Sequence, residues 1–207
     1  MFLARSSTWQ RTVTRPGASG ISVVELWVTK DGGTTWKFCC EDKDRQSPLQ
    51  TRLDGEGVYG LTLVAKNGLG VGERPPVSGD PPQTWVEIDS TPPLVRLFPP
   101  EIGKGSDLGS VIITWKAEDA NLGDRCVSLF YVEGSQGNPK PIATAIENTG
   151  RYVWKLDSPM PPRFRVAIEV ADQAGNSKMV ESLDVTVDNS RPRPRIQAIS
   201  PGGSYRR

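Results

Sequence analysis

The feature that most constrains the fold of this 207-residue chain is an internal repeat. The segment 59–70 (YGLTLVAKNGLG) is repeated 105 positions later as 164–175 (FRVAIEVADQAG). The segment 88–93 (IDSTPP) is repeated 99 positions later as 187–192 (VDNSRP). The longer copies alternate apolar and polar residues, which is the pattern of a β-strand with one buried face. A period near 100 residues is the length of one seven-stranded β-sandwich.

Short strand-like segments separated by turn residues fill the rest of the chain. Glycine (21) and proline (18) are abundant, and the apolar residues follow no helical period. Turn sequences such as Asp54-Gly55 and Gly175-Asn176 lie between the segments. Strands are expected at 23–29, 34–39, 48–53, 58–66, 83–88, 94–98, 110–117, 126–132, 139–145, 151–156, 163–171 and 179–187.

These segments predict an all-β chain of two tandem β-sandwiches. The first is expected at 1–89 and the second at 90–188, followed by a linker or tail at 189–207. Only residues 1–20 remain for the first two strands of the first repeat, whereas 94–117 supplies two strands at the start of the second. The first sandwich is therefore expected to lack its first strands, and the chain is expected to be an excerpt from a longer array.

The composition excludes several function classes. The chain has no histidine, which removes the commonest general base and metal ligand. Its 25 Lys and Arg balance 24 Asp and Glu, so no overall field attracts nucleic acid. Adjacent carboxylates such as Glu118 and Asp119 point to opposite faces of a strand and cannot flank one bond. No catalytic residue is identified, and we expect that the chain is not an enzyme.

Targeting and redox signals are weak. The apolar run after Met1 ends at Ala4, so no signal peptide is predicted, and no segment is apolar enough to span a membrane. Three cysteines, two of them adjacent, fit neither a paired disulfide framework nor a zinc site. Cys39, Cys40 and Cys126 are therefore expected to be thiols in partly buried strands, and their redox state is left open.

The segment 59–72 resembles strand F of a fibronectin type III domain. Leu53, six residues before Tyr59, resembles that family's corner, in which the tyrosine hydroxyl bonds to upstream backbone. Trp115 lies where the family has a core tryptophan on strand B. The second repeat has Phe164 in place of the tyrosine, so the hydroxyl bond is not expected there. The resemblance implies two immunoglobulin-like or fibronectin type III-like sandwiches.

Two further motifs resemble the tandem immunoglobulin-like repeats of large bacterial surface and secreted proteins. They are DQAGN at 172–176 and the linker DSTPP at 89–93. This resemblance implies an extracytoplasmic location, at the cell surface or secreted. It also implies that the partners are neighbouring domains of a longer chain and a protein or glycan ligand.

Acidic residues gather in the loops of the second repeat that share a pole with the entering linker. Oxygen ligands at a domain junction suit Ca²⁺, which would stiffen the array. The alternative is that these side chains cap turns and solvate loop tips. The candidate calcium ligands are Asp89, Glu118, Asp119, Asp124 and Asp172, with Asn121 and Asn176 beside them.

Other segments suggest a contact surface. The loop at 71–82 contains paired prolines, and it is expected either to offer Arg74 and Asp80 to a ligand or to act as a spacer or inter-domain brace. Alternation along their strands places Trp27 and Phe130 on the outer sheet face, where an aromatic ring stacks on a sugar, a partner or a neighbouring strand.

The segment 29–36 (TKDGGTTW) matches the sialidase-type Asp box. A single copy is expected to be a structural hairpin in which Asp31 caps the turn. The basic tail at 191–195 lacks interleaved aromatic residues and is expected to be solvated.

The sequence thus favours a non-catalytic module of a bacterial surface or secreted protein that spaces and presents loops for adhesion or scaffolding. One alternative is an accessory module of an extracellular glycan-active hydrolase. A further alternative is a truncated remnant with no role of its own.

Overall fold

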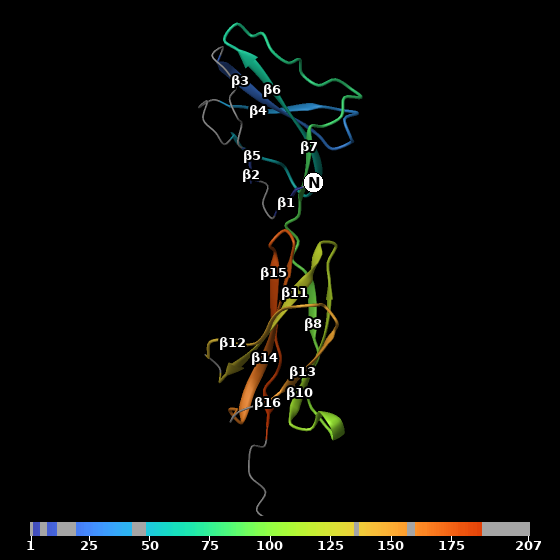
Figure 1. The fold of residues 1–207 in the computed structure, drawn as a ribbon, viewed down its shortest axis with the longest axis vertical. Coiled ribbons are helices and arrows are strands. Elements are labelled where there is room, and N and C mark those ends of the chain that lie inside the picture. The colour runs from blue at the N-terminus through green and yellow to red at the C-terminus, as the bar shows by residue number, and fades with distance from the viewer. Residues whose placement is uncertain are drawn as a thin grey trace, which may run out of the picture.

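The computed structural model describes residues 2–4, 8–11, 20–42, 49–134, 137–156 and 160–187. It is built from β-strands that form two sandwiches joined end to end by one extended linker (Figure 1). The all-β prediction is therefore confirmed. No strand of β1–β7 pairs with a strand of β8–β16 in this part of the chain. The exact domain boundaries, at 89 and 188, stay predictions.

The first sandwich contains a five-stranded sheet and a two-stranded sheet. The larger sheet has the order β1 (Phe2–Ala4), β7 (Thr84–Ile88), β6 (Gly57–Asn67), β3 (Ile21–Thr29) and β4 (Lys37–Glu41). The smaller sheet pairs β2 (Thr8–Arg11) with β5 (Leu49–Arg52). Its core forms because alternate residues of each strand face inward. The buried members are Leu26, Leu49, Leu53, Tyr59, Leu61, Val86 and Ile88.

The second sandwich contains a fuller set of strands. One sheet has the order β13 (Arg151–Lys155), β10 (Ser110–Glu118), β8 (Leu94–Leu97), with β9 (Glu101–Ile102) also on β10. The other contains β12 (Lys140–Ile146), β11 (Leu122–Glu133), β14 (Arg163–Asp172), β15 (Ser177–Glu181) and β16 (Val185–Thr186). A short 3-10 turn, η1 (Gly105–Asp107), lies between β9 and β10.

The two sandwiches differ at their first strands. Residues 1–20 contribute β1 and β2, which the sequence pattern did not predict. In the second sandwich β10 has β13 on one edge and β8 on the other. In the first sandwich β2 takes the place of β10 and pairs with β5. Among the described residues no strand that corresponds to β8 lies on the other edge of β2. In the described part of the chain, the first sandwich therefore differs from the second by this edge strand.

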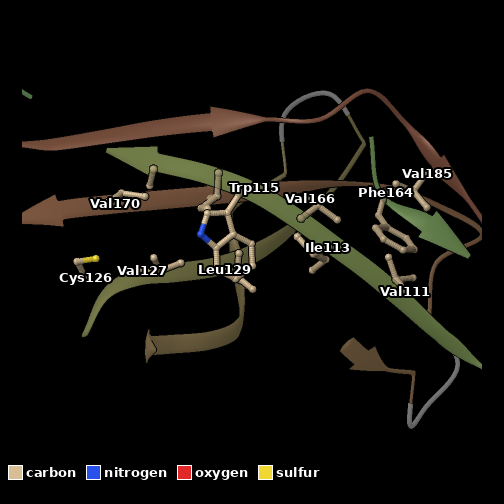
Figure 2. Packing of buried hydrophobic residues seen from close by; sticks show 12 residues of the cluster. Val111, Ile113, Trp115, Cys126, Val127, Leu129, Phe164, Val166, Val170 and Val185 are labelled. Atoms are coloured by element: carbon tan, nitrogen blue, oxygen red, sulfur yellow. The ribbon is translucent and has the colours of Figure 1, made fainter. Parts of the chain in front are cut away.

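The core of the second sandwich lies between β10 and the sheet of β11 and β14 (Figure 2). Trp115 on β10 is 3% exposed, and its Nε1 donates to Asn148 Oδ1 at 2.9 Å. Phe164 replaces the corner tyrosine and is 1% exposed, with its ring edge-on to Trp154 and Tyr131. The second sandwich therefore replaces the corner hydrogen bond with aromatic packing.

The tyrosine corner is present in the first sandwich, as the sequence predicted. The Tyr59 ring is buried, and its hydroxyl contacts the carbonyl oxygens of Asp54 and Gly55. These bonds fix the turn between β5 and β6. The same turn faces the linker to the second sandwich.

Candidate metal centre at the junction of the sandwiches

The linker between β7 and β8 is fixed first by its own residues. Asp89 is 8% exposed, and its Oδ1 accepts a hydrogen bond from the Thr91 backbone N–H at 3.0 Å. Pro92 and Pro93 follow, and proline restricts both its own φ and the residue before it. The carboxylate of Asp89 is therefore held in one direction, toward the second sandwich.

Two asparagines of the second sandwich hold the linker. Asn121, in the loop between β10 and β11, donates from Nδ2 to Asp89 Oδ2 at 2.6 Å. Asn176, in the turn between β14 and β15, donates from Nδ2 to the backbone carbonyl of Asp89 at 3.0 Å. Asn176 is only 2% exposed, so this contact excludes most solvent.

The turn after β14 places a second carboxylate beside the first. Asp172 Oδ1 accepts the backbone N–H of Asn176 and Oδ2 accepts its side-chain Nδ2, each at 2.8 Å. Gly175 has φ +90°, a conformation that L side chains rarely adopt, which allows the tight turn. The sequence DQAGN is therefore the local reason that Asp172 and Asn176 face Asp89.

A third carboxylate comes from the end of β10. Asp119 Oδ1 accepts the backbone N–H of Asn121 at 2.7 Å, which fixes the loop between β10 and β11. One carboxylate oxygen from each of Asp89, Asp119 and Asp172 lies within 4.8 Å of the others. Two oxygens that bind one Ca²⁺ at roughly 2.3–2.6 Å lie at most about 5 Å apart, so this spacing fits one shared ion.

Charge at the junction is strongly negative. A cavity of about 480 Å³ is lined by the carboxyl-bearing residues Glu56, Glu87, Asp89 and Asp119 and by no lysine or arginine. Asn side chains offset part of the repulsion between the carboxylates, because an amide N–H donates to them. A divalent cation would offset more, and Ca²⁺ takes six to eight oxygen ligands in an irregular shell. The candidate ligand atoms here are carboxylate oxygens, which Ca²⁺ prefers.

Two of the predicted calcium ligands lie outside this group. Glu118 follows the buried Ala117 on β10, so alternation turns it outward, where it pairs with Lys116 at 2.5 Å. Asp124 is exposed near the start of β11 and is not among the three close carboxylates. The tertiary structure thus selects Asp89, Asp119 and Asp172 from the five acidic residues.

Glu56 is a junction residue that sequence reasoning missed. Its Oε1 accepts hydrogen bonds from Ser90 Oγ at 2.6 Å, Thr91 Oγ1 at 2.9 Å and the Ser90 backbone N–H at 3.1 Å. These bonds, those of Ser90 and Thr91 side chains first, lower the pKa of Glu56. Glu56 is 34 positions from Ser90, and no local pattern marks this contact.

No family model and no curated protein matches the chain. Among solved structures, the fibronectin(III)-like modules of Clostridium thermocellum CbhA match with a TM-score of 0.53 and 18% identity, covering 94% of each chain. A tetra-tandem repeat from the extending region of a large adhesion protein matches with a TM-score of 0.35 and 16% identity, over 82% of this chain and 42% of that one.

The fold is that of fibronectin type III-like sandwiches. The predicted resemblance is therefore confirmed at the level of fold. Among the described residues, no helix is long and apolar enough to cross a membrane.

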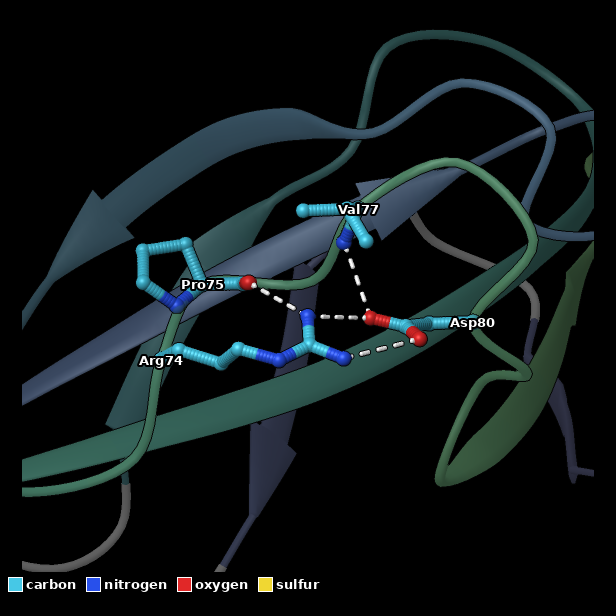
Figure 3. Close-up of polar contacts among 4 residues, drawn as sticks. All are labelled: Arg74, Pro75, Val77 and Asp80. Atoms are coloured by element: carbon cyan, nitrogen blue, oxygen red, sulfur yellow. Dashed lines mark hydrogen bonds and ion pairs between the residues drawn. The ribbon is translucent and has the colours of Figure 1, made fainter.

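The long loop of the first fibronectin type III-like sandwich is braced internally. Arg74 forms a two-point ion pair with Asp80, Nη1 to Oδ2 at 2.7 Å and Nη2 to Oδ1 at 3.1 Å (Figure 3). Asp80 Oδ2 also accepts the Val77 N–H at 2.9 Å. The loop packs against the hairpin between β3 and β4, since Gly79 N–H donates to the Gly33 carbonyl. Arg74 and Asp80 thus brace the loop internally, an arrangement that the sequence did not predict.

The two outward aromatic residues differ in their surroundings. Trp27 is half-buried, with its Nε1 bonded to Glu25 Oε2 at 3.0 Å and its ring edge-on to Phe38 at 5.8 Å. Phe130 is half-buried on β11, level with Pro141 and Ala167 of the adjacent strands. Among the aromatic side chains whose burial the structure describes, Phe38 has the most exposed ring, at 53%.

The Asp-box segment is a structural hairpin. Asp31 Oδ2 accepts Thr35 Oγ1 at 2.6 Å, and Oδ1 accepts the Thr35 N–H and Thr29 Oγ1, each at 2.8 Å. These bonds, the Thr35 hydroxyl first, lower the pKa of Asp31 to about 2. The carboxylate is committed to capping the turn, as the single copy predicts.

The three cysteines are unpaired. Cys39 and Cys40 are half-buried on β4, and Cys126 is buried on β11. Burial raises the pKa of both Cys40 and Cys126. The thiols of Cys40 and Cys126 therefore have little thiolate character, which agrees with the expected packing role.

Proposed function

We propose that this chain is a non-catalytic spacer module in which two fibronectin type III-like sandwiches are held in a fixed orientation by a Ca²⁺-binding junction. The single observation that carries the proposal is the position of Asp89. This linker residue is bonded to Asn121 and Asn176 and lies beside the carboxylates of Asp119 and Asp172. A spacer needs a stiff linker, and these contacts hold Asp89 at the start of a linker that continues with two prolines.

The absence of histidine supports a non-catalytic role, since a Ser or Cys nucleophile here has no imidazole base. The fibronectin type III-like fold also supports a modular role within a larger protein, with neighbouring domains and a protein ligand as partners. An extracytoplasmic location, at a bacterial cell surface or in the medium, would supply millimolar Ca²⁺. Adhesion or scaffolding is the function we assign to such an array.

A thermal melt of the whole chain in EGTA and then in millimolar Ca²⁺ tests the proposal. We expect the melting temperature to rise by several degrees with Ca²⁺. The rise should disappear in Asp119→Asn and Asp172→Asn and should remain in Asp124→Asn, whose carboxylate lies outside the group. A melting temperature that does not change with Ca²⁺ would contradict the calcium site. So would a calcium-induced rise that is lost equally in all three variants. The absence of a cooperative melt under both conditions would contradict the proposal that the chain is a folded spacer module.

A second candidate function is a saccharide-binding accessory module, with a glycan as partner. The observation that favours it is the half-exposed Phe38 ring, which lies beside a cationic groove. Binding to a panel of immobilised glycans tests this role. Loss of binding in Phe38→Ala but not in Phe130→Ala would support it, and absence of any glycan binding would refute it.

A further inference from the structure

We propose that a groove on the first sandwich binds the carboxylate-bearing end of an acidic saccharide. This inference rests on the second candidate function and gives it a site and a ligand class. The groove has a volume of about 450 Å³ and opens between the end of the β3–β4 hairpin and the turn after β5. A volume of this size is typical of sites for small ligands.

Positive charge surrounds the mouth of the groove. Lys30, Lys37 and Arg52 line it, against the single carboxylate of Asp54, and all four residues are exposed. The whole chain has a net charge of only +1, so this excess is local. Lysine side chains that line one opening raise the local concentration of an anion and attract its carboxylate.

The structure holds one of these cations in place. Lys30 Nζ lies 3.2 Å from the carbonyl oxygen of Asp54 and 4.5 Å from the centre of the Tyr59 ring. The Tyr59 hydroxyl in turn contacts the same carbonyl, so the corner that fixes the fold also fixes Lys30. The nearby carboxylate of Asp31 accepts hydrogen bonds from the side chains of Thr29 and Thr35, and the structure gives no ion pair between it and Lys30 among the described residues.

The groove also offers an apolar wall. Leu53 and Tyr59 are buried at its base, and Val28 is half-buried beside them. Phe38 stands at the rim with 53% of its surface exposed, and its other side rests on Trp27. An apolar wall with a few convergent charges is the usual make-up of a small-ligand site. A sugar ring that bears one carboxylate matches both features, because the ring can lie on the apolar wall while the carboxylate faces the cationic side chains.

The shape of β4 favours a saccharide over an acidic peptide. A peptide would most readily add as a strand along the exposed edge of a sheet. The pairing of β4 with β3 is irregular, because the register shifts between the Leu26–Cys40 and Trp27–Phe38 pairs. Such a bulge bends an edge strand and disfavours further strand pairing. The groove therefore suits a compact ligand that enters end-on.

Fluorescence titration of the whole chain with trigalacturonate tests the site, since Trp27 adjoins the rim. We expect saturable binding that weakens at least tenfold in Lys37→Glu and in Phe38→Ala. The matched control, Lys104→Glu, makes the same charge change on an exposed loop of the second sandwich and should bind like the parent chain. Thermal melts of all three variants establish that each is folded.

Two further probes separate the alternatives. Neutral galactotriose should bind at least tenfold more weakly than trigalacturonate, because it lacks the carboxylates. If hexaglutamate binds as tightly as trigalacturonate, or if Lys104→Glu weakens binding as much as Lys37→Glu, the attraction is a general effect of charge and the proposal is overturned. Absence of trigalacturonate binding would overturn it as well. Glycan-array binding that survives in Lys37→Glu would place the second candidate function at another surface. The calcium-dependent melt of the junction is a separate readout that none of these results alters.

Discussion

Replacing Asn176 with alanine should weaken the junction more than any other single removal of an amide. The side chain is 2% exposed, and its Nδ2 donates both to the Asp89 carbonyl at 3.0 Å and to Asp172 Oδ2 at 2.8 Å. Both acceptors lose a donor in the variant. The backbone N–H of residue 176 still donates to Asp172 Oδ1, so the turn itself is retained.

The magnitude follows from the two acceptors. A buried acceptor left without a donor costs about 1–3 kcal/mol, and more when it is charged. The junction cavity lies against Asp89 and admits water to it, so we take the low end, about 2 kcal/mol in total. For a domain of roughly 100 residues this lowers the melting temperature by about 8–16 °C.

Urea unfolding and calorimetry of the whole chain in EGTA measure this change. Asn138→Ala is the matched control, because Asn138 is exposed in the loop before β12. A destabilisation below about 0.5 kcal/mol, the usual range for a surface substitution, would refute the reasoning that Asn176 holds the linker. A destabilisation of Asn176→Ala no larger than that of Asn138→Ala would refute it as well.

Three further predictions follow from single contacts. Tyr59→Phe removes the hydroxyl that contacts two carbonyls and should destabilise the first sandwich by about 1–2 kcal/mol in urea unfolding, and a loss confined to the second sandwich would contradict this. Gly33→Ala places a Cβ 2.2 Å from the Asp80 carbonyl oxygen at φ +97° and should cost about 1–3 kcal/mol, whereas an unchanged melt would refute the packing of the loop on the hairpin. The folded pKa of Glu56 is lowered, so its stabilisation is present above its unfolded pKa of about 4.3 and is lost as pH falls through the folded pKa. The stability gap between the parent chain and Glu56→Gln should therefore narrow from pH 6 to pH 3, and a constant gap would be inconsistent with this role.

Local patterns predicted most strands because alternation is a property of a few adjacent residues. The expected strand at 58–66 is β6, at 57–67, and the expected strand at 163–171 is β14, at 163–172. The expected strand at 179–187 is instead divided into β15 and β16. Ser182 interrupts it, since its Oγ accepts the Val166 N–H. A side chain that replaces a backbone partner leaves no mark on the apolar pattern.

The sequence alone determined the all-β class, the two sandwiches and the turn motif that prepares Asp172, because repeats, alternation and turn residues act over short distances. It also indicated that acidic residues gather near the linker. Only the tertiary structure decided which of them meet. Alternation on β10 turns Glu118 outward, the two asparagines draw in Asp89, and Glu56 reaches Ser90 across 34 positions. The cationic groove likewise exists only after β5 is placed beside the β3–β4 hairpin, because Arg52 and Asp54 follow the two lysines of the hairpin by at least 15 positions.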